Sequence, residues 1–294
     1  MKTLFPYFSG VLIAVFFLTT PAQAQLRYGF KTGLNFASIN GPSEMDSGGS
    51  ELESWSSITG FHIGLSLGYA FNDYLGVRSE FLYSKKGAKY TFDGPSYRIF
   101  RLDGVSTLTT GNSRYRININ NAYLDIPLVA YGRWKDFELS AGMYASLLVQ
   151  SIGDGSLNYT NGRTAVLQNP VADVELFLDY NYRKDEPGRG IEGQTEVVQV
   201  DAKTVELPKT LGAYYDFTED KGNLYNTLDY GLVAGLSYFM SRSLFIGVRL
   251  QYGLADLTRN AADLSKGSTD NGNLLFRDDK DRNVVIQASV GFSF

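Results

Sequence analysis

The sequence contains no cysteine among its 294 residues, which excludes disulfide bonds, thiol catalysis and thiolate metal sites. It contains a single histidine, His62, so any imidazole chemistry would depend on that one side chain. No apolar stretch after residue 24 is long enough to cross a bilayer as a helix. A membrane protein with this sequence would therefore have to cross with strands, which satisfy their backbone hydrogen bonds only in a closed barrel.

Proline is also scarce, with 8 residues, whereas glycine (31), tyrosine (20) and phenylalanine (19) are abundant. This composition suits an outer-membrane barrel. Without its first 24 residues the chain carries 26 Lys and Arg against 31 Asp and Glu, a net charge of −5. We expect no nucleic-acid partner, because a mildly acidic chain lacks the basic field that attracts phosphate backbones.

The N-terminal 24 residues have the pattern of a secretory signal peptide. Lys2 precedes an apolar run from Leu4 to Leu18, and Ala22-Gln23-Ala24 offers a small-residue cleavage site. The run is short for a membrane-spanning helix. We predict a signal peptide over residues 1–24 and a mature outer-membrane domain over residues 25–294, with no cysteine for lipid attachment.

The end of the chain shows the clearest strand pattern. From Asn283 to Phe294, alternate residues are apolar and the residues between them are mostly small or polar. In a transmembrane barrel the apolar face would contact lipid. This stretch also resembles the C-terminal signal by which outer-membrane assembly machinery recognises its clients, carried here by Val290, Phe292 and Phe294.

Seven further segments alternate in the same way, and long loops and short turns separate them in strict succession. These features predict an all-β fold: an eight-stranded antiparallel up-and-down transmembrane β-barrel. Its short turns and both termini would be periplasmic, and its long loops extracellular. A soluble exported β-sandwich is the alternative, but aromatic residues gather beside the short turns as in a membrane girdle. The predicted strands are residues 26–39, 59–71, 74–90, 115–134, 137–147, 227–239, 244–254 and 283–294.

Two of the connections between the predicted strands are especially long. Residues 93–112 are read as a loop, and residues 152–224 as a long, charged extracellular loop. Within the second, Val174–Tyr182 and Val198–Ala202 alternate and could pair as a β-hairpin above the membrane. They could also add two membrane strands, which would make ten. The charged connector Lys184–Glu192 favours the extracellular hairpin, because it is long for a periplasmic turn.

The inward faces of the predicted strands carry four basic and four acidic residues. An eight-stranded barrel has room for little more than its own side chains, and unpaired charges there would be costly. We predict a charge network that plugs the lumen; a gated ion pathway or small diffusion pore is the alternative. The network residues are Arg27, Lys31, Arg78, Glu80, Asp125, Glu138, Asp229 and Arg249.

Catalytic and metal sites are not predicted. His62 has Ser57, Ser66 and Glu80 as neighbours along the strands, but no spacing defines a catalytic dyad. The acidic clusters at 216–220 and 278–281 lack the spaced oxygen ligands of a calcium loop. No glycine-rich loop precedes a helix, so we expect no cofactor.

Several strand segments together resemble the porin-family, PorT-like outer-membrane β-barrel proteins of Bacteroidetes-type bacteria. The resemblance covers most of the mature chain outside residues 152–224. It implies an integral outer-membrane protein, and PorT itself belongs to the type IX secretion apparatus. The segments are Tyr28–Asn35, Gly60–Gly64, Glu80–Gly87, Tyr123–Leu128, Asp229–Leu232 and Gly247–Leu254.

The resulting functional hypothesis is a non-enzymatic outer-membrane barrel that acts through its extracellular loops or as an accessory of an envelope complex. A type IX secretion component is an alternative, although the large third loop departs from the compact family pattern. The expected partners are outer-membrane lipid, lipopolysaccharide, the outer-membrane assembly machinery and an envelope or secretion complex.

Overall fold

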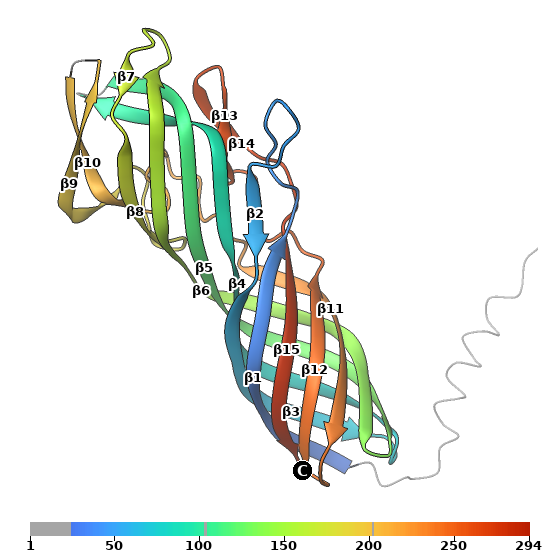
Figure 1. The fold of residues 1–294 in the computed structure, drawn as a ribbon. Helices are drawn as coiled ribbons and strands as arrows, with labels where there is room; N and C mark the ends of the chain where they lie inside the picture. The colour runs from blue at the N-terminus through green and yellow to red at the C-terminus, as the bar shows by residue number, and fades with distance from the viewer. Residues whose placement is uncertain (1–24, 103–104, 202) are drawn as a thin grey trace, which may run out of the picture.

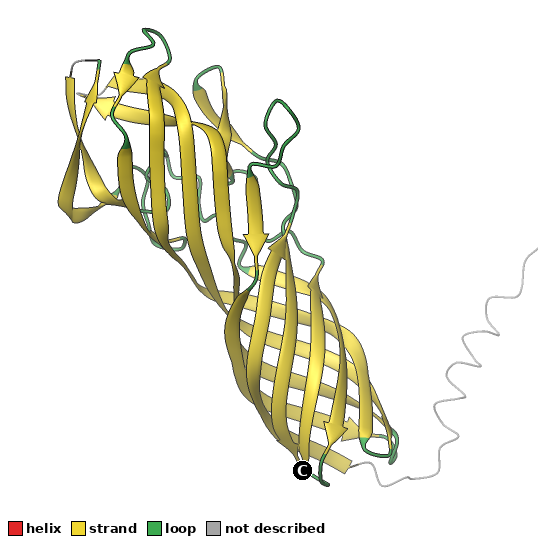
Figure 2. Ribbon diagram, viewed as in Figure 1, coloured by secondary structure: helices red, strands yellow, loops and turns green. Residues whose placement is uncertain are grey.

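The structure is a computed structural model that describes residues 25–102, 105–201 and 203–294. The predicted signal peptide lies outside these residues. Strands make up nearly all of the regular structure, and the described residues contain no helix long and apolar enough to cross a bilayer (Figure 2). The strands are β1 (Gln25–Asn40), β2 (Glu53–Ser56), β3 (Ile58–Ala70), β4 (Leu75–Leu102), β5 (Val105–Trp134), β6 (Phe137–Thr164), β7 (Pro170–Val171), β8 (Val174–Asn181), β9 (Gly190–Val200), β10 (Lys203–Leu211), β11 (Leu228–Phe239), β12 (Leu244–Gly253), β13 (Leu264–Asp270), β14 (Asn273–Phe276) and β15 (Arg282–Ser293).

Eight strands pair in a closed antiparallel ring, here called the barrel. The ring runs β1-β3-β4-β5-β6-β11-β12-β15 and closes where β15 pairs with β1. None of β8, β9 and β10 enters it, so the ten-stranded alternative is not what the pairing shows. Both ends of the described chain lie at the end of the barrel that carries the short turns (Figure 1).

The predicted alternation holds through the barrel. Outward apolar side chains such as Leu65, Leu128 and Val248 are more than half exposed, while inward polar ones such as Glu80 and Asp125 are buried. Phe239, an aromatic beside a short turn, does not face outward: it is buried, and the Arg133 guanidinium lies 3.7 Å from its ring centroid. A cation–π contact at the barrel mouth thus holds Phe239 inward.

Pro127 interrupts the ladder of β4 and β5 without shifting it. Pairs are formed at Ser79–Leu128 and again at Leu82–Asp125, and the two intervening positions are unpaired. Proline has no N–H to donate, so the ladder loses bonds here while the register is kept.

Strands β4, β5 and β6 continue far beyond the ring and form, with β2, β7–β10, β13 and β14, an outer part here called the extension (Figure 1). The prediction of a loop over residues 93–112 is wrong. Strands β4 and β5 remain paired through this stretch up to Leu102 and Val105. The predicted loop over 152–224 likewise begins as strand, because β6 runs to Thr164.

The predicted hairpin has different partners. Strand β8 pairs antiparallel with β6, in continuation of the sheet, and not with β9. The hairpin of this region is β9 with β10, and β10 joins β8 in parallel at Thr210 and Leu211. Alternation alone could not choose between these partners, since all of the segments present similar apolar faces.

A β-bulge at Val149 separates the barrel from the extension on β6. Tyr123 of β5 pairs with Leu148, and the adjacent Ala122 pairs with Gln150, so Val149 has no opposite residue. Below the bulge the even-numbered residues of β6 point inward, for example Tyr144 and Leu148; above it, as far as Tyr159, the odd-numbered ones do. The extra residue therefore turns the other face of β6 inward.

The extension has its own hydrophobic core, which contains more than twenty buried side chains from β4, β5, β6, β8 and the segments laid against them. Phe92, Leu157, Tyr159 and Leu176 are among those almost completely buried. The segment between β10 and β11 and the β13–β14 hairpin cover this core, with Phe217 stacked on Phe276 at 5.7 Å between ring centroids.

Candidate functional site

Glu80 on β4 is the centre of the ion-pair network in the barrel. Arg249 on β12 donates to both of its carboxylate oxygens at 2.7 Å, and the Lys31 ammonium on β1 lies 2.6 Å from one of them. Arg78 joins Glu80 (3.3 Å) to Glu138 on β6 (2.8 Å). All of these side chains are nearly buried, so the network crosses the lumen from wall to wall.

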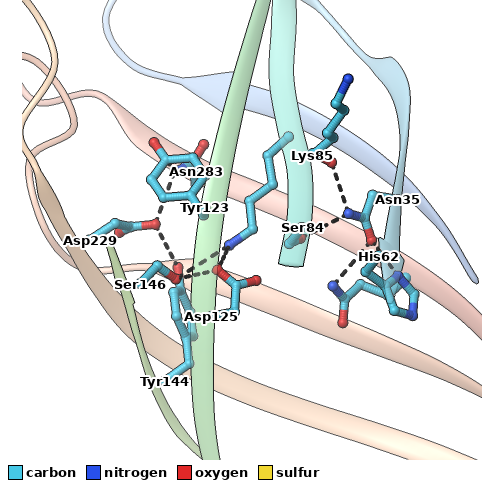
Figure 3. Close-up of polar contacts among 12 residues, drawn as sticks. Asn35, His62, Ser84, Lys85, Tyr123, Asp125, Tyr144, Ser146, Asp229 and Asn283 are labelled. Carbon is cyan, nitrogen blue, oxygen red and sulfur yellow. Dashed lines mark hydrogen bonds and ion pairs between the residues drawn. The ribbon is translucent and has the colours of Figure 1, made fainter. Parts of the chain in front are cut away.

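Lys86 is the centre of a second cluster, nearer the extension. Its ammonium lies 2.9 Å from Asp125 and about 5 Å from the rings of Tyr123 and Tyr144. Ser146 donates to the same carboxylate at 2.6 Å. Figure 3 shows Asp125, Ser146 and Tyr144 close to Asp229. Asp229 accepts from Asn283 at 2.9 Å and from Tyr144 at 3.2 Å.

The eight predicted lumen residues thus fall into two groups. Lys31, Arg78, Glu80, Glu138 and Arg249 meet in the first cluster, and Asp125 and Asp229 in the second. Arg27 is half-buried and lines a small cavity at the barrel mouth with Arg78 and Glu138.

Two lumen cations were not predicted. Lys86 pairs with Asp125, and Arg133 donates to Glu138 at 3.0 Å. Both continue the alternation of inward residues on β4 and β5, and following that parity to the ends of the strands would have found them. Asp125 therefore has a cation of its own in Lys86.

His62 joins two polar neighbours inside the barrel. Its Nδ1 lies 2.8 Å from the Asn35 side-chain oxygen, and its Nε2 lies 2.9 Å from the Ser289 hydroxyl. Asn35 in turn donates to Ser84 and to the Lys85 carbonyl (Figure 3). A Ser–His–Asn order can activate a serine, but here the imidazole is completely buried. Neither Ser57, Ser66 nor Glu80 is its partner.

The three residues of the predicted C-terminal signal lie on the outer face of the barrel. Val290 and Phe292 on β15 are 41% and 45% exposed, and the Phe294 ring stacks on Phe292 at 6.4 Å. Phe294 also exchanges backbone hydrogen bonds with Tyr28, so the ladder of the closing strand pair continues to the last residue.

The extension contains a partly enclosed cavity of about 80 Å³. Its walls come from β2, the outer halves of β4 and β5, the end of β8, the segment before β11 and the loop between β12 and β15. They include Trp55, Tyr90, Tyr182 and Tyr225. At roughly 15 Å³ for each water, the cavity has room for about five waters or a small organic group.

Asp263 and Asp281 line this cavity, and Asp279 lies beside them. Oxygen atoms of Asp263, Asp279 and Asp281 all lie within 4.8 Å of one another. By distance they could hold a cation, although the Arg277 guanidinium already contacts Asp279 and lies 2.6 Å from Glu53. The acidic cluster at 278–281 is apparent in the sequence. Asp263 comes from a separate part of the loop and was not predicted to join it.

Burial raises the pKa of Asp263 from 3.8 to about 7, against the attraction of Arg277, and the neighbouring Asp281 and Asp279 raise it further. Burial likewise raises the pKa of Asp281 to about 6, and the charge of Asp279 adds to the effect. Both carboxyls therefore keep their protons to a higher pH than an exposed aspartate does.

A family model described as outer membrane protein beta-barrel domain matches residues 21–259. The chain belongs to this outer-membrane β-barrel family. The matched range contains seven of the eight ring strands and ends before β15. Membership locates the protein in the outer membrane, and the exposed apolar face of the barrel is then its lipid-facing surface.

Comparison with individual known proteins finds only distant similarities. No curated protein matches the chain. Among solved structures it is similar to Neisserial surface protein A, with 10% identity, TM-score 0.35 and coverage of 91% of this chain and 97% of that one. It is also similar to Ail of Yersinia pestis in complex with sucrose octasulfate, with 11% identity, TM-score 0.33 and coverage of 92% of this chain and 99% of that one. A third similar structure is the outer membrane protease OmpT from Escherichia coli, with 8% identity, TM-score 0.30 and coverage of 94% of this chain and 99% of that one. Similarities this distant carry no argument about the function of this chain.

Proposed function

We propose that this protein is a non-conducting, non-enzymatic outer-membrane barrel that binds a partner or ligand at the cell surface through its extension. The length of three strands carries the proposal. A transmembrane strand needs about 9–11 residues, whereas β4, β5 and β6 contain 28, 30 and 28. Residues 85–102 of β4 lie beyond the ring and span about 60 Å at roughly 3.3 Å per residue.

The proposed orientation has the short turns and both termini in the periplasm and the extension outside the cell. Short periplasmic turns and long outer connections are the rule in bacterial barrels. The test is an epitope tag inserted at the exposed tip around Val166 and Leu167, compared with one in the 240–243 turn. Antibody should label intact cells with the first tag only; labelling of the second tag alone would reverse the orientation.

The charge network in the lumen supports the proposal that the barrel does not conduct. A chain of buried ion pairs spans the barrel from β1 to β6 through Glu80 and Arg78, and opening it would separate charges in a confined space. In planar bilayers the purified protein should show no steady conductance. A large, stable conductance would contradict the plugged lumen and favour a small diffusion pore.

The proposed absence of enzymatic activity can be tested at Ser289, whose hydroxyl lies next to the His62 imidazole. Ser289 lies against the buried His62, so a fluorophosphonate probe should not label it. Labelling that disappears in Ser289→Ala would instead reveal a hydrolase.

The partner is expected in the envelope, either lipopolysaccharide and lipid around the barrel or a protein complex above it. Native pull-down from detergent-solubilised outer membrane asks for that partner directly. A secretion-apparatus role, as in PorT, predicts that deletion abolishes export of proteins with the type IX sorting domain. Normal export would leave surface binding as the function.

A further inference from the structure

Eight aromatic side chains line the cavity of the extension. Trp55 and Tyr90 pack at 4.8 Å between ring centroids. Tyr182 packs edge-on against Tyr225 at 5.0 Å and against Tyr180 at 5.5 Å. The faces of aromatic rings carry the negative part of the aromatic quadrupole, which attracts a cation.

Three of these tyrosines have polar groups that the described chain does not satisfy. Tyr180, Tyr182 and Tyr225 are each at least nine-tenths buried and line the cavity. Their hydroxyls make no hydrogen bond to any described residue, whereas Tyr90 donates to Glu53 and Tyr214 to the Tyr182 carbonyl. These hydroxyls are not among the sealed polar atoms that lack a partner, so they open on the cavity and can donate to a polar occupant there.

The side chains that line the cavity include more carboxylates than cations. Arg277 pairs with Glu53 and Arg98 with Asp216, and Lys266 lies over the Tyr115 ring. Asp263 and Asp281 make no ion pair in the described part of the chain, and Asp281 accepts only the Thr258 hydroxyl among side-chain donors. The surplus carboxylates therefore face the aromatic walls across the same cavity.

We infer that this cavity binds a small organic ammonium ion, with its charge against Asp263 and Asp281 and its apolar body against the aromatic rings. This inference deepens the surface-binding function proposed above and rests on it. Cation–π attraction and an unpaired carboxylate both favour a cation with an apolar body. An anion would meet the surplus negative charge, and a bare divalent ion would leave the rings and hydroxyls unused.

Tryptophan fluorescence gives a direct assay. The chain has two tryptophans, and Trp134 lies 69% exposed at the opposite end of the barrel. In a Trp134→Phe background, Trp55 reports the cavity alone. Choline chloride, titrated at pH 8 and constant ionic strength, should produce a saturable change in emission. The neutral isostere 3,3-dimethylbutan-1-ol should bind at least about tenfold more weakly, because it lacks the charge.

Matched variants separate the two halves of the site. Asp263→Asn should weaken choline binding about tenfold, whereas Asp270→Asn, which removes an exposed carboxylate outside the cavity, should leave it unchanged. Tyr225→Phe keeps the ring and should bind choline within about threefold of the unsubstituted chain, whereas Tyr225→Leu should lose about tenfold. Heat-modifiable migration on gels confirms that each variant retains its barrel.

Three outcomes overturn the inference: no saturable response to choline, equal binding of the neutral isostere, or a response to Ca²⁺ or glucose in place of choline. Each leaves the proposed function standing if the barrel is still non-conducting and the extension still labelled on intact cells. Conduction, in contrast, would refute the plugged lumen without affecting the titration.

Discussion

The barrel and the extension share three strands but bury opposite kinds of side chain. In the barrel, β4–β6 point charges such as Glu80 and Glu138 inward and expose apolar residues such as Leu128. In the extension, the same strands point Phe92, Tyr115 and Leu157 inward. The surroundings explain the difference, because lipid covers the outside of the barrel whereas water surrounds the extension.

The comparison also explains why the strands need a discontinuity. Strands β4 and β5 keep the same parity throughout, but β6 changes parity at Val149. Without that bulge, Ser156 and Asn158 would occupy the core positions of Leu157 and Tyr159. The bulge thus joins a sheet that is polar inside to a sheet that is apolar inside.

Deletion of Val149 should have the largest effect. A one-residue shift exchanges the faces of a strand, so the β6 segment above the bulge would turn its apolar side chains to water. We expect the extension to unfold while the barrel still forms, measured as rapid proteolysis of residues 150–225 with unchanged heat-modifiable migration. Deletion of the exposed Lys221 is the control. An intact extension without Val149 would show that the bulge does not set the register.

Glu80→Gln should cost the barrel about 3–5 kcal/mol, because it leaves Lys31, Arg78 and Arg249 without their shared carboxylate. Urea unfolding in lipid vesicles measures the change. Asp136→Asn, at an exposed turn, is the matched control. A loss of less than about 1 kcal/mol would mean that water enters the lumen and screens these charges.

Leu128→Lys and Phe177→Lys compare the outer faces of the two regions. The two side chains are 55% and 51% exposed, one on the barrel and one on the extension. In lipid the lysine should cost about 2–4 kcal/mol near the bilayer midplane; in water it should cost less than about 0.5 kcal/mol. Equal costs in vesicle unfolding would refute the assignment of the two surfaces to two solvents.

The smallest expected effect is a dependence of the extension on pH. Because the pKa of Asp263 is raised to about 7 and that of Asp281 to about 6, the folded extension binds more protons than the unfolded chain between about pH 4 and 7. Its stability should therefore fall as the pH rises through this window, with Arg277 and Lys266 limiting the loss.

Hydrogen exchange of the β13–β14 hairpin at pH 5 and pH 8 measures this change. Exchange, corrected for its intrinsic pH dependence, should be faster at pH 8, and Asp263→Asn should remove most of the difference. A difference of the opposite sign would show that Asp263 is ionised and paired in the folded state.

Much of the barrel was predictable because strand alternation is a local property. The eight ring strands appear at the predicted places, and the charged lumen residues follow from their parity. The prediction failed beyond the membrane, at residues 93–112 and 152–224, where the strands continue. Polar outer faces and a change of parity at Val149 made that paired sheet look like loop.

The sequence by itself thus determined which residues face lipid and which face the lumen, since a period of two needs no knowledge of partners. Only the tertiary structure decided that β8 pairs with β6, that β9 pairs with β10, and that Lys86 reaches Asp125. It also brought Trp55, Tyr182, Tyr225 and Asp263 around one cavity. These residues are far apart in the chain, and only long-range packing selects such contacts.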